Sequence, residues 1–421
     1  MESGKRDMTV YAPIDPGESM DAIGNRIQQH AQTRRSHPAL IDEQGTLDWR
    51  SLVDQVNRIA NRLREAGLRP GESVAALSGN SRDDVALYLG TLVAGGCMVP
   101  LSGMASSEAL ALMVADCQAR FLFVSGQQRE LFGRLRAQLT KVPGERIISL
   151  AGPLDGAGYS LVDWLAQTTA TARPEPVTLD DPFNIIYSSG TTGTPKGILH
   201  DYRFRQRQMV RMSRYGLDGE AINLVSTPLY SNTTLVSVLP TLYHGGTLVL
   251  MAKFDAHRFL QLAETHRVTH AMLVPVQYQR ILAQPDFDRF DLSSFKLKLC
   301  TSAPLRSAVI ADAMARWPGN LRELQNRLRQ ALLLGESPQI SAEDMGFIPN
   351  PNDNHDRNRE LSLDAFRSRA DRQAISVSLA LAHNNVSAAA RLLNISRVSF
   401  YRLMDKHHVP HGPSTRLQKD S

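Results

Sequence analysis

The most informative stretch of this sequence is Ser188-Ser189-Gly190-Thr191-Thr192-Gly193-Thr194-Pro195-Lys196-Gly197. Its glycines allow the backbone to approach a ligand closely, its hydroxyls supply hydrogen-bond donors, and Lys196 adds a positive charge. This composition predicts a loop that holds the phosphates of a nucleotide. The order differs from the GxxxxGK[ST] of a Walker A loop, because Pro195 precedes the lysine and Gly197 follows it. On composition alone, a Ser/Thr/Gly connector without a ligand is the alternative.

Helical and strand-like segments alternate on both sides of this loop. Apolar residues from Trp49 to Leu63 recur at helical spacing, and Gly67 stands where a helix would end before the strand-like run 73–77. Short apolar runs of the length of a buried strand occupy 121–124, 146–150, 184–187, 247–251 and 270–274, and a helical pattern covers 256–266. Since parallel sheets covered on both faces have such runs, we expect an α/β architecture with a largely buried sheet.

The loop and its surroundings resemble the adenylate-forming superfamily, which comprises acyl-CoA synthetases, luciferases and peptide-synthetase adenylation domains. The similarity is strongest over Tyr187–Gly197 and extends from about Tyr11 to Gly319. Further stretches that carry it are Thr227-Pro228-Leu229-Tyr230, Gly245-Gly246-Thr247-Leu248-Val249 and Cys300-Thr301-Ser302-Ala303-Pro304-Leu305. The resemblance implies that residues 1–319 form a truncated AMP-binding domain.

The resemblance also implies a chemistry for the loop. In this family a carboxylate attacks the α-phosphate of ATP to form an acyl-adenylate, and a thiol such as coenzyme A captures the acyl group. Thr191, Thr192 and Lys196 would contact the β- and γ-phosphates and offset their charge as the bond to the α-phosphorus breaks. ATP and magnesium are thus the expected ligands. Ser231 stands where many acyl-CoA synthetases carry a histidine near the acyl pocket, so the acyl substrate stays open.

Several motifs of the same family have no counterpart after Gly319. They are the Tyr-Gly-x-Thr-Glu motif that packs adenine and positions magnesium, the ribose-binding aspartate, the hinge and the mobile domain with the catalytic lysine. Their loss removes positioning and transition-state electrostatics together. We therefore assign no catalytic residue and no metal ligand, and we expect an inactive domain. Loss of the last strands would also leave an unpaired sheet edge and exposed apolar surface, which predicts poor solubility.

A second resemblance begins at Trp317-Pro318-Gly319, where the two patterns overlap. Residues 317–326 and 339–344 are similar to the end of the AAA+ module in sigma-54-dependent enhancer-binding activators, and Arg322 matches the phosphate-sensing arginine of that family. The sequence lacks the Walker motifs and the sigma-factor-contacting loop, so no ATP-driven remodelling is implied. The alternative is an amphipathic helix whose leucines face a core: Leu321, Leu324, Leu328 and Leu332.

The C-terminal part has the pattern of two short helices around a tight turn. A linker rich in Asn, Asp and Pro precedes a helical stretch over 366–383. Residues 384–387 are predicted to provide a break and an N-cap for a short helix over 388–393, and Ser396 is predicted to cap the next helix. We expect Val398, Tyr401 and Met404 of that second helix to face inward. The pattern is typical of a helix-turn-helix, and residues 385–397 resemble the Fis-type DNA-binding domain.

The outer face of the second helix carries the candidate DNA contacts, which are Ser396, Arg397, Ser399, Arg402 and Lys406. The first four are expected to reach bases or phosphates, and the last to position the domain. Residues 361–421 contain nine Lys or Arg and four Asp or Glu, an excess that equals the net charge of +5 of the whole chain. A solvated basic face on a small helical bundle is the alternative. Fis-like domains commonly pair, so helix 366–383 is a candidate contact of a homodimer.

Length and composition set the remaining limits. With 421 residues, of which 42% are hydrophobic, the chain is long enough for two or three globular domains. The N-terminus lacks a secretory signal, and the longest apolar run, 85–101, is interrupted by glycines and a proline. A cytoplasmic location without membrane insertion is therefore expected. Cys97, Cys117 and Cys300 lack CxxC or Cys/His clustering, which argues against a disulfide framework or a zinc site and predicts buried thiols.

The predicted segments are a partial AMP-binding domain over 1–319, an AAA+ helical remnant over 317–348, a linker over 349–365, a Fis-type domain over 366–411 and a disordered tail over 412–421. We favour a DNA-binding module of regulator type joined to an incapacitated adenylate-forming domain. One alternative is an ATP-dependent acyl-CoA ligase with a DNA-binding tail. The other is a gene-fusion product without selected function.

Overall fold

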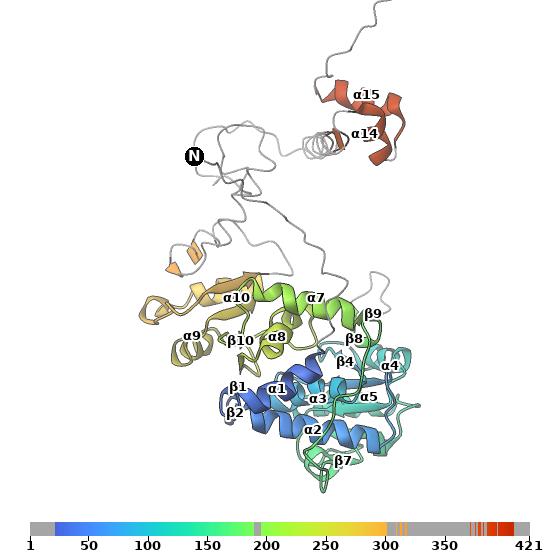
Figure 1. Ribbon diagram of the computed structural model, residues 1–421, viewed down its shortest axis with the longest axis vertical. Helices are drawn as coiled ribbons and strands as arrows, with labels where there is room; N and C mark the ends of the chain where they lie inside the picture. The colour runs from blue at the N-terminus through green and yellow to red at the C-terminus, as the bar shows by residue number, and fades with distance from the viewer. Residues whose placement is uncertain are drawn as a thin grey trace, which may run out of the picture. The chain divides into compact units, whose positions relative to one another are not determined.

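The computed structural model describes residues 22–188, 195–300, 385–393 and 395–407 together with positions 309, 312–313, 316–317, 371, 375, 378–379 and 382. The chain divides into two units, Met1–Phe347 and Ile348–Ser421, and each is described by itself. Figure 1 labels their helices and strands. Among the described residues, no helix is both long and apolar enough to cross a membrane.

The first unit contains a seven-stranded sheet. In spatial order its strands are β7 (Tyr159–Ser160), β6 (Ile147–Ser149), β5 (Phe121–Val124), β3 (Ser73–Leu77), β4 (Cys97–Leu101), β8 (Pro182–Ser188) and β9 (Lys196–Asp201). Every neighbouring pair is parallel except the β8–β9 hairpin. Strands β3, β4 and β5 are buried along their whole length, as the short continuous apolar runs predicted.

A six-stranded sheet completes the unit. Its strands in spatial order are β13 (Leu297–Cys300), β12 (His270–Leu273), β10 (Ile222–Val225), β11 (Thr247–Leu250), β1 (Pro38–Asp42) and β2 (Gly45–Asp48). Here the only antiparallel pair among the described strands is β1–β2. The predicted α/β architecture is confirmed, and the structure resolves it into two largely parallel sheets.

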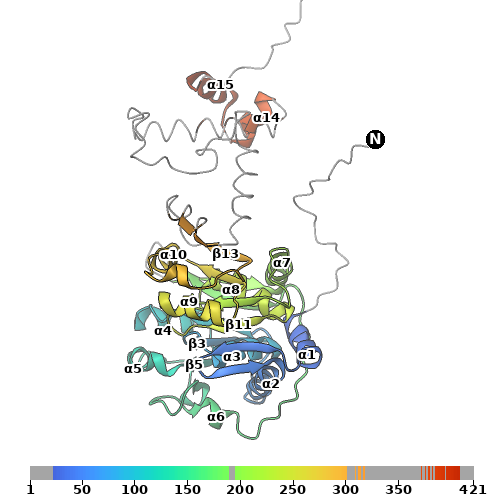
Figure 2. The same cartoon turned by 90° about the vertical axis from the view of Figure 1, so that its left-hand side faces the viewer.

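Helices cover the faces of both sheets. One core joins the two sheets with α1 (Ile23–Thr33), α2 (Trp49–Glu65), α3 (Arg82–Val93), α6 (Leu161–Trp164), α7 (Tyr202–Ser213) and α8 (Asn232–His244). A second core lies where α4 (Ser107–Asp116) and α5 (Arg129–Arg136) pack on the seven-stranded sheet. A third joins α9 (Ala256–Thr265) and α10 (Pro275–Leu282) to the six-stranded sheet, and Figure 2 shows these two helices next to each other. Short 3-10 turns occupy Gly126–Gln128, Gly144–Arg146 and Phe287–Arg289.

The period of the strand decides which core each side chain enters. In β3, Val74 and Ala76 enter the core shared by both sheets, whereas Ala75 and Leu77 face α4 and α5. Local signals set the ends of the helices. Asp48 caps α2 by accepting a hydrogen bond from the Ser51 amide at 2.8 Å, and Gly67 follows that helix with a φ of +88°.

The second unit contains α14 (Val386–Leu392) and α15 (Arg397–Lys406). The apolar core of this unit contains Ala389 and Ala390 of α14, Phe400 and Met404 of α15, and Ile375. The first helix therefore begins at Val386 rather than at the predicted residue 388. The predicted inward orientation of Val398 is wrong, because its side chain is 62% exposed whereas Phe400 is fully buried. Phe400 and Met404 are four residues apart and share one face, from which Val398 is turned away.

The cysteines follow the prediction in part. Cys97 and Cys117 are buried, but Cys300 is only partly buried because it ends β13 at the edge of the six-stranded sheet. The described positions 371, 375 and 378–379 of the predicted helix 366–383 are helical. The predicted AAA+ remnant beyond Trp317, the linker and the tail lie outside the described residues.

Candidate functional site

The predicted phosphate loop joins the two strands of the β8–β9 hairpin. Ser188 is paired with Lys196 at the end of the ladder that the loop connects, and Tyr187 is paired with Gly197 next to it. Both Ser188 and Lys196 are exposed, so their hydroxyl and ammonium groups are accessible. Six of the predicted site residues lie outside the described residues: Ser189, Gly190, Thr191, Thr192, Gly193 and Thr194.

Tyr187 anchors the base of this loop. Its hydroxyl donates to the carbonyl oxygen of Met113 at 3.0 Å and to Asp116 Oδ2 at 2.6 Å. Burial, together with the hydrogen bond to Asp116, raises the pKa of the Tyr187 phenol. The phenol therefore stays protonated and keeps its role as a donor. The hairpin is thus tied to α4 directly before the phosphate loop begins.

A buried positive charge contacts both strands of the hairpin. The Arg205 side chain is fully buried, and its Nε donates to Asn184 Oδ1 at 2.8 Å while Nη1 donates to Gln208 Oε1 at 2.8 Å. Nη2 lies 3.4 Å from His200 Nδ1. Burial, followed by the charge of Arg205, lowers the pKa of His200 to about 4, so this imidazole is neutral at physiological pH. The cationic group that faces solvent at the hairpin is therefore Lys196 and not His200.

Asn80 is a polar hub that sequence reasoning missed. Its Nδ2 donates to the carbonyl oxygens of Thr227 at 2.9 Å and Met251 at 3.1 Å, and its Oδ1 accepts from the Leu229 amide at 3.0 Å. Asn80 follows β3, whereas its partners follow β10 and β11, so one side chain links the carboxyl ends of strands from both sheets. The signal available in the sequence was a polar residue placed shortly after the buried run 73–77.

The carboxyl ends of β3 and β8 lie at the same edge of the seven-stranded sheet, because both strands run parallel to β4 between them. This edge therefore brings together the start of the phosphate loop and the Asn80 hub with its Thr227–Leu229 segment. In open α/β sheets, ligands bind in the crevice outside the carboxyl ends of the strands. Among the described residues, no group of three His, Cys, Asp or Glu side chains is arranged to hold a metal ion.

The second candidate site is the exposed surface of α15. The Ser396 hydroxyl caps the helix by accepting from the Ser399 amide at 3.0 Å, as predicted. On a helix, Ser399, Arg402 and Lys406 share one face, and that face is opposite to the buried Phe400 and Met404. All three residues are exposed. The helix therefore presents a polar and basic surface on the side opposite its buried residues.

Arg397 lies on a different side of α15 from this surface. Its guanidinium is 5.5 Å from the centre of the Tyr401 ring, and its Nη2 lies 3.4 Å from the Tyr401 hydroxyl. This contact orients the guanidinium at the start of the helix. The five predicted DNA contacts thus form two groups, one at the N-terminus of α15 and one along its outer face.

Two covered parallel sheets with a Gly/Thr-rich hairpin at the carboxyl edge are the architecture of an adenylate-forming enzyme domain. Residues 27–326 match the model of the AMP-binding enzyme family, and the chain belongs to that family. Residues 366–407 match the model of the Fis family of bacterial regulatory proteins, which places a Fis-type helix-turn-helix in the same chain. The resemblances to the adenylate-forming superfamily and to the Fis-type DNA-binding domain are confirmed.

Curated relatives are ligases. Feruloyl-CoA synthase from Amycolatopsis sp is 35% identical over 289 residues, which is 67% of this chain and 54% of that protein. The fatty acid–[acyl-carrier-protein] ligase ScoC from Streptomyces coeruleorubidus is 28% identical over 68% of this chain and 54% of its own length. The chain thus spans about half the length of the curated relatives it matches.

Solved structures agree on the fold. ATP-bound MatB from Rhodopseudomonas palustris superimposes with a TM-score of 0.60 at 26% identity, covering 70% of this chain and 58% of MatB. The anthranilate CoA ligase AuaEII, in complex with anthranoyl-AMP, gives a TM-score of 0.64 at 24% identity over 70% of this chain and 58% of AuaEII.

Proposed function

We propose that this chain binds DNA selectively through α15 and that its adenylate-forming domain does not complete the ligase reaction. The observation that carries the first part is the exposed surface of Ser399, Arg402 and Lys406 opposite the buried Phe400 and Met404. A recognition helix needs this division, since one face must hold the helix on its domain while the other enters the major groove.

The residue types suit different parts of a DNA duplex. The guanidinium groups of Arg397 and Arg402 are suited to bidentate bonds with guanine O6 and N7 or with phosphate. The hydroxyls of Ser396 and Ser399 fit bases or phosphate oxygens. Lys406, at the end of the helix, fits the phosphate backbone and would contribute to the salt dependence of binding without selecting a sequence.

The test is binding of the full chain to labelled genomic fragments across a salt series. We expect saturable binding that resists competition by random DNA and weakens as the salt concentration rises. Arg402→Ala should weaken binding to the selected fragment by about tenfold or more and relax its selectivity. Lys406→Ala should weaken binding to all fragments alike. Arg280→Ala, on the exposed side of α10, is the matched control. Equal binding to selected and random DNA would overturn the proposal.

For the first unit, we infer that the β8–β9 hairpin still provides the elements of a phosphate site. Ser188 and Lys196 fit this role, because a hydroxyl donor and a cation are both exposed at the loop end of the ladder. Thr191, Thr192 and the neighbouring glycines would complete the site for the phosphates of ATP. When bound with magnesium, ATP supplies the α-phosphate to which a carboxylate is joined. The names of the curated relatives suggest carboxylic acids as the substrate class of an active form, with coenzyme A as acceptor.

The inferred lack of ligase activity rests on the sequence beyond Gly319. The Tyr-Gly-x-Thr-Glu motif of the family does not occur there, and a different family's pattern takes its place. The test is ATP–pyrophosphate exchange with a panel of aromatic and fatty acids, alongside a direct measurement of ATP binding. We expect ATP binding that Lys196→Ala abolishes and no exchange above background. Acid-dependent exchange would instead establish a ligase with a DNA-binding tail.

We further propose the boundaries 1–319, 317–348, 349–365, 366–411 and 412–421 for the segments of the chain, and pairing of two copies through helix 366–383. Limited proteolysis checks the boundaries, and the molar mass in solution checks the pairing.

A gene fusion without selected function is the competing account of the junction at Trp317-Pro318-Gly319. Sequencing genomic DNA across this junction tests it, since two complete neighbouring genes would refute a selected fusion.

A further inference from the structure

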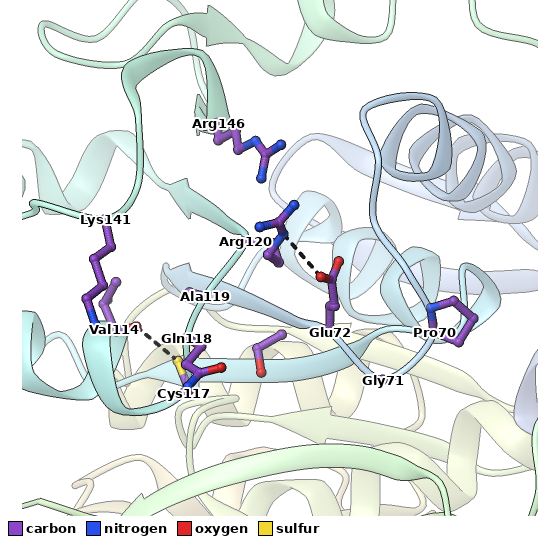
Figure 3. A pocket seen from close by; sticks show the side chains of 11 residues that line it. Pro70, Gly71, Glu72, Val114, Cys117, Gln118, Ala119, Arg120, Lys141 and Arg146 are labelled. Atoms are coloured by element: carbon purple, nitrogen blue, oxygen red, sulfur yellow. Dashed lines mark hydrogen bonds and ion pairs between the residues drawn. The ribbon is translucent and has the colours of Figure 1, made fainter.

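We propose that a cavity at the amino ends of β3, β5 and β6 is a binding site for a small phosphorylated molecule that carries two negative charges. The cavity has a volume of about 610 Å³. It is drawn in Figure 3, and the polar residues that carry the argument are Glu72, Ser73, Arg120, Lys141 and Arg146. Pockets for small molecules typically measure about 300–1,000 Å³, so the cavity has the size for such a ligand.

The cavity is distinct from the β8–β9 hairpin. Ser73 is the first residue of β3, and Arg120 and Arg146 directly precede β5 and β6. Because these three strands are parallel neighbours, the residues before them meet at the amino edge of the seven-stranded sheet. The phosphate loop follows the carboxyl end of β8, which is parallel to them, and so belongs to the opposite edge.

The charges around the cavity are not balanced by the protein. Arg120 Nε lies 3.3 Å from Glu72 Oε1, which accounts for the single carboxylate in the lining. The Arg146 guanidinium lies 5.5 Å from the centre of the Phe121 ring, and it makes no hydrogen bond or ion pair with any described residue. The Lys141 ammonium also makes no hydrogen bond or ion pair within the described part of the chain. Three cations and one carboxylate leave two positive charges, which a dianion would neutralise.

The two arginines are also oriented for such a ligand. In Figure 3 their guanidinium groups are directed toward each other from the ends of β5 and β6, with no acidic side chain drawn between them. Like charges facing each other destabilise the protein, and an anion between them would reverse the sign of this interaction. A guanidinium also presents several donors in a plane that matches phosphate oxygens.

Ser73 adds a hydroxyl group to the lining of the cavity. The residue is only 7% exposed and lines the cavity, yet its hydroxyl has no hydrogen-bond partner among the described residues. Its oxygen keeps contact with solvent, so the hydroxyl can exchange a hydrogen bond with solvent for one with an oxygen of a bound ligand. Cys117 also lines the cavity, but burial raises the pKa of its thiol to about 11. The thiol is therefore neutral and does not compete for the anion.

The test uses the full chain with Lys196→Ala, which removes the cation of the hairpin loop as a second phosphate site. Inorganic phosphate and ribose 5-phosphate are the probes, titrated calorimetrically, and amide hydrogen exchange locates the bound probe. We expect saturable binding of ribose 5-phosphate with protection confined to 70–73, 117–121 and 141–147. Arg146→Gln should weaken binding by about tenfold or more, Ser73→Ala by a smaller factor, and Arg280→Gln not at all.

Arg146→Lys serves as the second variant, because it keeps the charge and should retain part of the affinity. Thermal unfolding of each variant in the absence of probe reports whether the fold is kept. The proposal is overturned if neither probe binds at concentrations up to about 10 mM, if Arg146→Gln binds as tightly as the parent chain, or if protection appears outside the three segments.

Discussion

The ring of Tyr187 lies so close to Gly197 that a Cβ at position 197 would stand 3.2 Å from the ring atoms Cε1 and Cζ. The two residues face each other in the β8–β9 ladder, and the Tyr187 hydroxyl is bonded to Met113 and Asp116. A side chain at position 197 would therefore press on a ring that is fixed at its far end. Glycine avoids this contact at the base of the phosphate loop, whether or not the loop holds a ligand.

Gly197→Ala should destabilise the first unit by about 1–3 kcal/mol, since the added methyl group overpacks the hairpin. Thermal unfolding followed by near-UV circular dichroism measures this change. Gly133→Ala is the matched control, because the space around Gly133 on α5 is open and alanine is the better helix former. Equal melting temperatures for the two variants would contradict the packing argument.

Asn80→Ala should lower the stability of the first unit more than the truncation of an exposed asparagine. It removes the hydrogen bonds to Thr227, Met251 and Leu229 and leaves buried backbone groups unsatisfied, which costs about 1–3 kcal/mol for each group. We expect a lower unfolding temperature and faster hydrogen exchange over 226–231. Asn25→Ala on the exposed side of α1 is the control. Unchanged exchange in that segment would show that other contacts hold it.

Lys298 predicts a pH dependence of stability. Its side chain lies in β13, 4.9 Å from the centre of the Trp317 ring and 5.1 Å from that of Phe295, and burial lowers its pKa to about 7 from 10.5. Below pH 7 the folded and unfolded states both carry the proton, so the cost of the buried charge is fully present. Between pH 7 and 10.5 the unfolded state binds more protons, and this contribution to stability rises with pH.

Lys298→Met removes the buried charge and keeps much of the volume. The variant should therefore melt above the parent chain at pH 6, and the difference should shrink as the pH approaches 10. Melting temperatures of both proteins over this range check the prediction. A difference that stays constant with pH would mean that Lys298 does not titrate in this window.

Phe400 and Val398 on α15 give a direct test of the orientation of the helix. Phe400→Ala removes a fully buried ring and should destabilise the second unit by about 3–5 kcal/mol, with loss of DNA binding through unfolding. Val398→Ala changes an exposed side chain and should leave the melting temperature nearly unchanged. Helical signal of the second unit, followed on heating, distinguishes the two. A larger loss of stability for Val398→Ala than for Phe400→Ala would show that Val398 faces inward.

The edge strand β9 of the seven-stranded sheet predicts self-association. β9 is an edge strand within the described part of the chain, and Ile198 and Leu199 on it are 44% and 57% exposed. Exposed apolar edges pair with other chains, so the average mass in solution should rise with protein concentration. Leu199→Lys should reduce this rise. Val162→Lys, at an exposed position on α6, should not, and light scattering compares the three proteins.

Much of the architecture could be predicted from short-range patterns. The run 73–77 became β3 and the helical spacing from Trp49 became α2, because burial of whole strands and of one helix face leaves a direct trace in the order of apolar residues. The cap at Ser396 was predictable for the same reason, since a cap involves neighbours three residues apart. Val398 was misplaced, because the phase of a short helix depends on which residues its domain buries.

The sequence by itself determined the succession of helices and strands and the hairpin loop with its glycines and lysine. It also determined to which family each of the two parts of the chain is related. These features are local, because each is carried by residues that are close together in the sequence. Only the tertiary structure decided that Asn80 joins the ends of both sheets, that Tyr187 is fixed against Gly197, and that Arg120 and Arg146 face one cavity with Ser73. These relationships depend on contacts between residues far apart along the chain, such as Asn80 with Met251 and Tyr187 with Met113. Their distances follow from strand order and parallel register, which no local pattern specifies.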